Sequence, residues 1–335
     1  MKNLSELSAS LGAITIARAP QGADAVFLAQ ALPGLMDRRQ AGGVAVDLLH
    51  VAVDDAAMTR MADALAFFRP DVEILTFPAW DCLPYDRVSP NSEIVSRRID
   101  TLVRLAQLRD TPPVGSAQPR VVLTTVNALL QRVPEAALLQ SARFAVRTGE
   151  TLDIDALTAF LNTNGYIRSD TVMEPGEYAL RGGLVDVFPA GSREPLRLDL
   201  FGDTLERIRS FDPMSQRSTG VVEALDLKPV SEVLLNAASI GRFRIAYRDT
   251  FGTSGDNDPL YEAISAGHRY IGMEHWLPLF HERLATLFDY LPDVILTLDT
   301  RADEARDARL AQIEDFYNAR RDLKRPLLDE DLDSR

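Results

Sequence analysis

Strand-like and helix-like segments alternate regularly over the first third of the chain. Buried strands are predicted at residues 12–19, 43–53, 71–77 and 119–126, with helices between them. Short apolar strands that alternate with helices are typical of a parallel sheet covered by helices on both faces. We therefore predict a parallel-sheet α/β domain for this part of the chain.

The pattern changes close to residue 144. A helix predicted at residues 154–166 is followed by several short strands, separated by turn sequences such as Glu-Pro-Gly and Gly-Asp. This order predicts a smaller α+β domain. One more buried strand, at residues 293–299, follows it, and its return to the first sheet would make the α+β domain an insertion. The predicted divisions are 1–143 (first part of the α/β domain), 144–228 (inserted α+β domain) and 229–335 (second part, with a C-terminal helix).

Composition limits the class of function. The 335 residues carry a net charge of −13, which argues against a protein whose whole surface binds nucleic acid, because phosphate contacts need clustered Lys and Arg. The single cysteine, Cys82, cannot form an internal disulfide or a cysteine-based zinc site. We find no secretion signal and no apolar run long enough to cross a membrane, so we expect a soluble cytoplasmic chain.

The loop before the first helix is where a parallel α/β domain would hold a nucleotide. A phosphate-binding loop needs flanking glycines, a lysine and a Ser or Thr. Here Gly22 is followed by Ala23 and Asp24, no lysine is present, and the carboxylate would repel phosphate. The four histidines lack the spacing of a helical zinc motif. We predict no cofactor, no metal and no catalytic residues.

An aromatic loop and the helix after it offer a possible contact with DNA. Trp80 and Tyr85 could stack on bases, and Arg97 and Arg98 lie outside the apolar stripe of the helix predicted at residues 91–108. The alternative is that the rings plug the loop into the edge of the sheet. The aspartates between the rings favour this alternative, because they would repel phosphate.

The stretch "RLDLF" suggests a different surface. In a strand, Arg197 and Phe201 fall on one side, and Leu198 and Leu200 fall on the other. If the leucines pack on the helix of the domain, Arg197 and Phe201 face outward together, with Arg181 on a neighbouring strand. Arginine and aromatic side chains are common anchors of protein interfaces. The alternative is that Phe201 closes the hairpin and Arg197 pairs with a nearby carboxylate.

Four stretches carry a resemblance to a known family: residues 77–102, 121–134, 173–191 and 196–218. They resemble the N-terminal part of the bacterial transcription-repair coupling factors (Mfd), and their order is similar to that in the damage-recognition protein UvrB. The resemblance implies a RecA-like α/β domain with a degenerate nucleotide loop, interrupted by a smaller domain that binds UvrA. The family's arginine and phenylalanine positions match Arg181, Arg197 and Phe201.

The resemblance also implies partners and parts beyond this chain. Coupling factors continue into an RNA-polymerase-interacting domain and an ATP-dependent translocase that works on duplex DNA, and an intramolecular contact keeps the UvrA-binding face covered. We therefore expect a UvrA-recruiting module that links stalled RNA polymerase to nucleotide excision repair and has no ATPase activity of its own. The alternative is a divergent UvrB-like, nucleotide-dependent DNA-binding enzyme.

Overall fold

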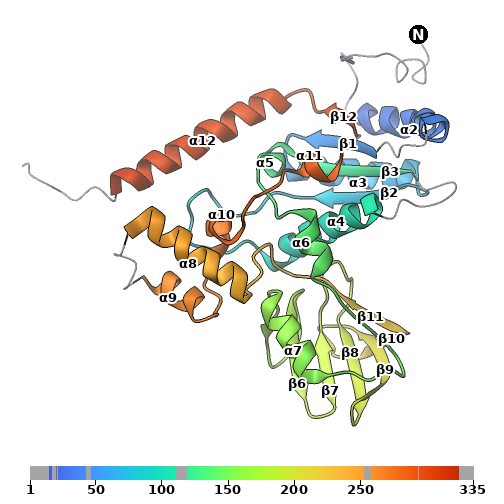
Figure 1. The fold of residues 1–335 in the computed structure, drawn as a ribbon. Helices are drawn as coiled ribbons and strands as arrows, with labels where there is room; N and C mark the ends of the chain where they lie inside the picture. Colours follow the sequence, from blue (N-terminus) through green and yellow to red (C-terminus); the bar gives the residue numbers. More distant parts are fainter. Residues whose placement is uncertain are drawn as a thin grey trace, which may run out of the picture.

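A four-stranded parallel sheet forms the first body of the protein (Figure 1). The structure is a computed structural model that describes residues 15–16, 20, 22–42, 47–110, 119–252, 258–292 and 294–323. The strand order is β12-β1-β3-β2, and all three pairings are parallel. The strands are β1 (Asp47–Ala52), β2 (Glu73–Phe77), β3 (Arg120–Thr125) and β12 (Val294–Leu298). The predicted parallel sheet and the return of the last strand are confirmed, whereas the strand predicted at 12–19 lies mostly outside the described residues.

Helices cover both faces of this sheet because its strands are apolar on both sides. On one face, α2 (Ala23–Gly42) and α3 (Asp55–Phe68) pack on a core that includes Leu48 of β1. On the other face, α4 (Ser92–Asp110) packs on a core that includes Leu49. The short helices α5 (Val126–Leu129) and α6 (Ala136–Ser141) follow β3 in the chain.

The second body is a domain inserted between β3 and β12 (Figure 1). Its entry and exit strands, β4 (Phe144–Arg147) and β11 (Ala224–Leu227), pair antiparallel. Between them lies a six-stranded sheet of order β10-β9-β8-β7-β6-β5, and α7 (Ile154–Thr163) packs on one of its faces. Its strands are β5 (Ile167–Arg168), β6 (Glu177–Arg181), β7 (Leu184–Val187), β8 (Leu196–Phe201), β9 (Thr204–Phe211) and β10 (Ser218–Val222). The predicted α/β fold with an inserted domain is confirmed.

A helical segment follows the insertion and builds a separate aromatic core, in which the rings of Phe243 and Phe280 stack with centroids 4.8 Å apart. Its helices are α8 (Ala237–Phe251), α9 (Pro259–Ser265), η2 (Met273–Trp276), α10 (Leu277–Phe280) and α11 (Leu287–Tyr290). After β12, the long α12 (Ala302–Leu323) extends along the outside of the molecule (Figure 1). Within the described residues, no helix has the length and apolar character to cross a membrane.

A buried ion pair joins α4 to the segment that follows the insertion. Arg98 of α4 is fully buried and donates from Nε to Oε1 of Glu232 over 2.6 Å. The indole N–H of Trp80 donates to the same carboxylate over 3.1 Å, and Arg98 also donates to the carbonyl oxygen of Pro78. The prediction that Arg98 lies outside the apolar stripe of its helix is therefore wrong. Its guanidinium is buried because it is bonded to the buried carboxylate of Glu232.

Candidate protein-binding surface

The six-stranded sheet turns one face to α7 and the other face away from it. Strand pairing arranges the outward side chains in rows that cross the strands. The first row consists of Ala179, Asp186, Arg197 and Arg209, which are Cα partners across β6, β7, β8 and β9. The second row, closer to the hairpin turns, consists of Arg181, Leu184, Asp199 and Arg207.

The first row is held by internal contacts. Arg197 forms two hydrogen bonds with the carboxylate of Asp186, of 2.7 and 2.8 Å, and its guanidinium lies over the ring of Phe211, 4.6 Å from the centroid. The hydrogen bond with Asp186 raises the pKa of Arg197. The Arg197 side chain is only 16% exposed and that of Asp186 3%. Arg197 therefore pairs with a carboxylate, as the alternative expected. It lies on the same side of β8 as Phe201, as the strand pattern predicts, but its side chain is mostly covered.

Phe201 is exposed, as the strand pattern predicts. The residue is 76% exposed, whereas Leu198 on the opposite side of β8 is fully buried. Phe201 ends β8 at a tight turn in which Gly202 has a φ of +59°, a conformation that favours glycine. The neighbouring hairpin lies close by, because the N–H of Leu200 donates to the carbonyl oxygen of Gly183 over 2.9 Å. Two hairpin turns therefore meet beside the exposed ring.

The second row carries cations that its own sheet does not neutralise. Arg181 is exposed and donates to the backbone carbonyl oxygen of Asp170, and Arg207 is also exposed. Neither guanidinium forms an ion pair with a described residue, whereas Asp199 between them is bound to Arg209 over 2.8 and 2.9 Å. Leu184, the remaining member of the row, is 36% exposed.

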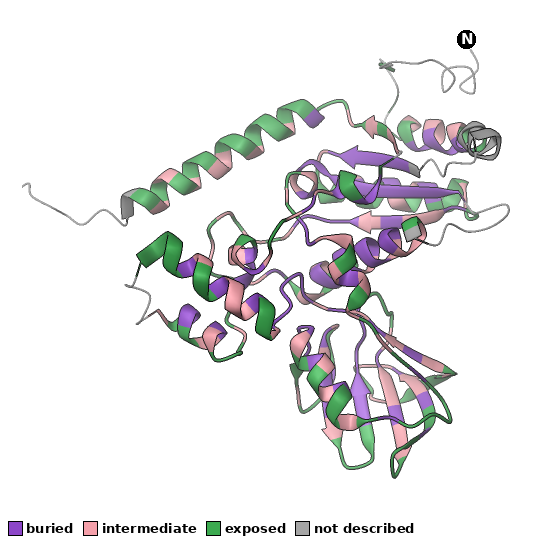
Figure 2. Ribbon diagram, in the orientation of Figure 1, coloured by how far each residue is buried: buried purple, intermediate pink, exposed green. Residues whose placement is uncertain are grey.

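We call Arg181, Leu184, Phe201 and Arg207 the hairpin-end surface. It lies at the end of the inserted sheet that points away from the parallel sheet (Figure 1), where the turns are exposed (Figure 2). The sequence identified Arg181 and Phe201 but missed Leu184 and Arg207. Only the register of the strands brings these last two residues into the row.

Comparison with known proteins matches this domain and the chain around it. Residues 144–232 match the UvrB interaction domain family. The transcription-repair-coupling factor of Escherichia coli is 38% identical over 296 residues, which cover 87% of this chain and 24% of that protein. The chain is homologous to the N-terminal region of the transcription-repair-coupling factors.

Other coupling factors match over a similar span. That of Haemophilus influenzae is 36% identical over 281 residues (83% of this chain, 24% of that protein), and that of Bacillus subtilis is 26% identical over 257 residues (72% and 21%). The chain therefore spans about a quarter of the length of the coupling factors that it matches.

The start of α2 is where the sequence predicts a degenerate nucleotide loop, at Gly22, Ala23 and Asp24. Gly22 has a φ of +82° and α2 begins at Ala23. Oδ1 of Asp24 accepts a hydrogen bond from the N–H of Ala25 over 2.9 Å. The carboxylate thus binds a backbone donor at the helix start, where a phosphate would otherwise find such donors. Residues 17–19 and 21 of the loop lie outside the described residues.

Two rings of the aromatic loop 78–90 contact other parts of the protein, although Tyr85 stays 43% exposed. Trp80 donates to Glu232, and Tyr85 lies 5.6 Å from the ring of Tyr317 on α12. The possible DNA contact through Arg98 is wrong, because its buried guanidinium cannot reach a phosphate. In the same loop, burial raises the pKa of the Cys82 thiol to about 11, so this thiol is protonated at neutral pH.

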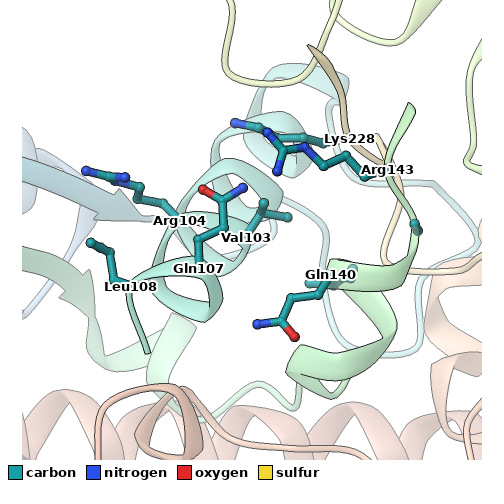
Figure 3. A pocket seen from close by; sticks show the side chains of 9 residues that line it. Val103, Arg104, Gln107, Leu108, Gln140, Arg143 and Lys228 are labelled. Carbon is teal, nitrogen blue, oxygen red and sulfur yellow. The ribbon is translucent and has the colours of Figure 1, made fainter. Parts of the chain in front are cut away.

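A cavity lies at the base of the inserted domain (Figure 3). It lies between α4 and α6, and is bordered by Arg143 and Lys228, which flank the inserted domain. Each of its cations already has a carboxylate partner: Arg143 pairs with Asp226, Lys228 with Asp100, and Arg104 with Glu73. The cavity therefore has little unpaired charge to attract an anion.

Proposed function

We propose that this chain is the UvrA-recruiting module of a transcription-repair-coupling factor and that it has no ATPase activity of its own. The observation that carries the proposal is the hairpin-end surface, where an exposed ring shares one face of the sheet with two guanidinium groups that have no ion-pair partner among the described residues. In a chain of net charge −13, cations left in this state favour a partner that supplies the missing carboxylates. The match to a UvrB interaction domain supports the choice of UvrA.

The three residues expected from the sequence have different roles in this proposal. Phe201 and Arg181 contact UvrA directly. Arg197 stabilises the sheet through its contacts with Asp186 and Phe211. It affects UvrA binding mainly by keeping the sheet folded. The proposed domains are 1–143, 144–228 and 229–335, in which the inserted domain carries the surface and the flanking parts orient it.

Further roles belong to a longer coupling factor. We propose that RNA polymerase and duplex DNA are bound by other parts of that protein, in the cytoplasm, and that an intramolecular contact covers the hairpin-end surface until polymerase is engaged. Such a contact would make UvrA recruitment a shift between two populations. Nucleotide binding by this chain is disfavoured by the carboxylate of Asp24 at the start of α2. Calorimetry with a non-hydrolysable ATP analogue should give no binding heat, and micromolar binding would favour the nucleotide-dependent alternative.

The test of UvrA recruitment is a binding titration between purified UvrA and this chain. We expect Phe201→Ala to weaken binding more than about tenfold, because an exposed aromatic at the centre of an interface is a common anchor. The melting temperature should stay the same, since the ring buries little in the free protein. Phe67→Ala, at an 81% exposed phenylalanine of α3, is the matched control and should bind as the unmodified chain does. Equal binding by both variants would contradict the proposal.

A further inference from the structure

We propose that the UvrA contact extends across four strands to Leu184 and Arg207, and that the contacting surface of UvrA is an apolar pocket with carboxylates on both sides. The inference rests on the proposed function and adds the chemistry of the epitope.

The register of the sheet supports a single continuous surface. Arg181 is the Cα partner of Leu184, Leu184 of Asp199, and Asp199 of Arg207. With neighbouring strands about 4.8 Å apart, the two arginine backbones lie roughly 14 Å from each other. Phe201 is two residues beyond Asp199 on the same side of β8, so the ring projects beside the middle of the row.

The apolar part of the surface comes from both hairpins. Leu184 follows the first turn and Phe201 precedes the second. The hydrogen bond from Leu200 to Gly183 holds these turns side by side. A Cβ added at Gly183 would lie 3.0 Å from the carbonyl oxygen of Leu200, so the close approach of the turns depends on this glycine. The exposed ring and leucine are therefore placed to enter one apolar pocket.

The charges on the hairpin-end surface indicate which groups should surround the apolar pocket of UvrA. The two interior carboxylates of the rows are neutralised, Asp186 by Arg197 and Asp199 by Arg209. Arg181 and Arg207 stand at either end of the second row without such a partner among the described residues. A partner with carboxylates at both ends of its pocket would satisfy both guanidinium groups in one docked arrangement.

A bulge provides an internal control for this inference. The pairing of β8 with β9 shifts after Asp199, so Glu206 has no cross-strand partner and stands exposed beside Arg207. If the epitope on UvrA is acidic, Glu206 opposes binding while Arg207 favours it. Removing one charge or the other should therefore change the affinity in opposite directions.

The experiment is a set of UvrA titrations at low and moderate salt. We expect Arg207→Gln to weaken binding about fivefold and Glu206→Gln to tighten it severalfold, the range for exposed charge pairs. Leu184→Ser should weaken binding about tenfold, because the partly exposed leucine would bury apolar surface in the complex. The control Arg193→Gln changes an exposed arginine between β7 and β8, at the other end of the sheet, and should bind like the unmodified chain. Salt should weaken binding of the unmodified chain more steeply than that of Arg207→Gln.

The outcomes separate this inference from the proposed function. If Phe201→Ala loses binding while Arg207→Gln, Glu206→Gln and Leu184→Ser match the unmodified chain, the extended acidic epitope is wrong and UvrA recruitment stands. Tighter binding by Arg207→Gln would point to a basic epitope and also overturn the inference. If the unmodified chain does not bind UvrA, the proposed function fails and the inference fails with it.

Discussion

The junction of α4 with the segment that follows the insertion and the far end of the inserted sheet use arginine in opposite ways. At the junction, Arg98 is fully buried and bound to Glu232, Pro78 and Gln131. At the hairpin-end surface, Arg181 and Arg207 are exposed and make no ion pair with described residues. A guanidinium whose carboxylate lies inside the protein serves the fold, whereas one without such a partner is available to another molecule. Arg197 combines the two cases. It lies on the inserted domain that carries the hairpin-end surface, but its guanidinium is bonded to the nearly buried carboxylate of Asp186.

The largest effect should follow from breaking the junction. Arg98→Ala would leave the carboxylate of Glu232 buried without its cation, which costs about 3–5 kcal/mol of unfolding free energy. Urea denaturation measures this loss. The adjacent Arg97→Ala is the control, because its exposed pair with Glu93 contributes only about 0.5 kcal/mol. Equal destabilisation by both variants would show that the buried pair is not what holds the junction.

An intermediate effect is expected at Arg197. Arg197→Ala removes both hydrogen bonds from the nearly buried Asp186 and should cost about 1–3 kcal/mol of stability. Thermal and urea denaturation should both report it, and the double variant with Asp186→Asn should recover part of the loss. An unchanged stability together with lost UvrA binding would instead place Arg197 among the direct contacts.

The smallest effect concerns the loop of the parallel-sheet body. With its pKa at about 11, on the order of 0.1% of Cys82 is thiolate at pH 8. Alkylation by iodoacetamide should therefore be slow at pH 8 and rise about tenfold per pH unit until the pKa is approached. The same protein in urea, where the thiol is exposed, supplies the reference rate. Fast alkylation of the folded protein at pH 8 would show that Cys82 is an activated thiol and would contradict the raised pKa.

Local pattern was enough to predict much of the fold. Strands that are apolar on both faces predicted the parallel sheet, and the last of them, β12, pairs with β1 as expected. The predicted C-terminal helix is present as α12 (Ala302–Leu323). Alternation in β8 correctly placed Leu198 inside and Phe201 outside, because the side-chain period of a strand depends only on the backbone.

The residues that pattern alone placed wrongly or missed have their contacts with residues in other segments of the chain. Arg98 is separated from Glu232 by 134 residues, so helical periodicity alone assigned it to the surface. Arg197 finds its carboxylate on β7, and its aromatic neighbour is Phe211 rather than Phe201. Arg207 joins the surface through a register that includes a bulge, and the bulge has no clear signature in the sequence.

The most direct test of the account is amide hydrogen exchange on this chain with and without UvrA. The account predicts that UvrA slows exchange in the two hairpins, at residues 181–184 and 201–207, and leaves the loop 78–90 of the parallel-sheet body unchanged. Slowed exchange in loop 78–90, with both hairpins unaffected, would contradict it.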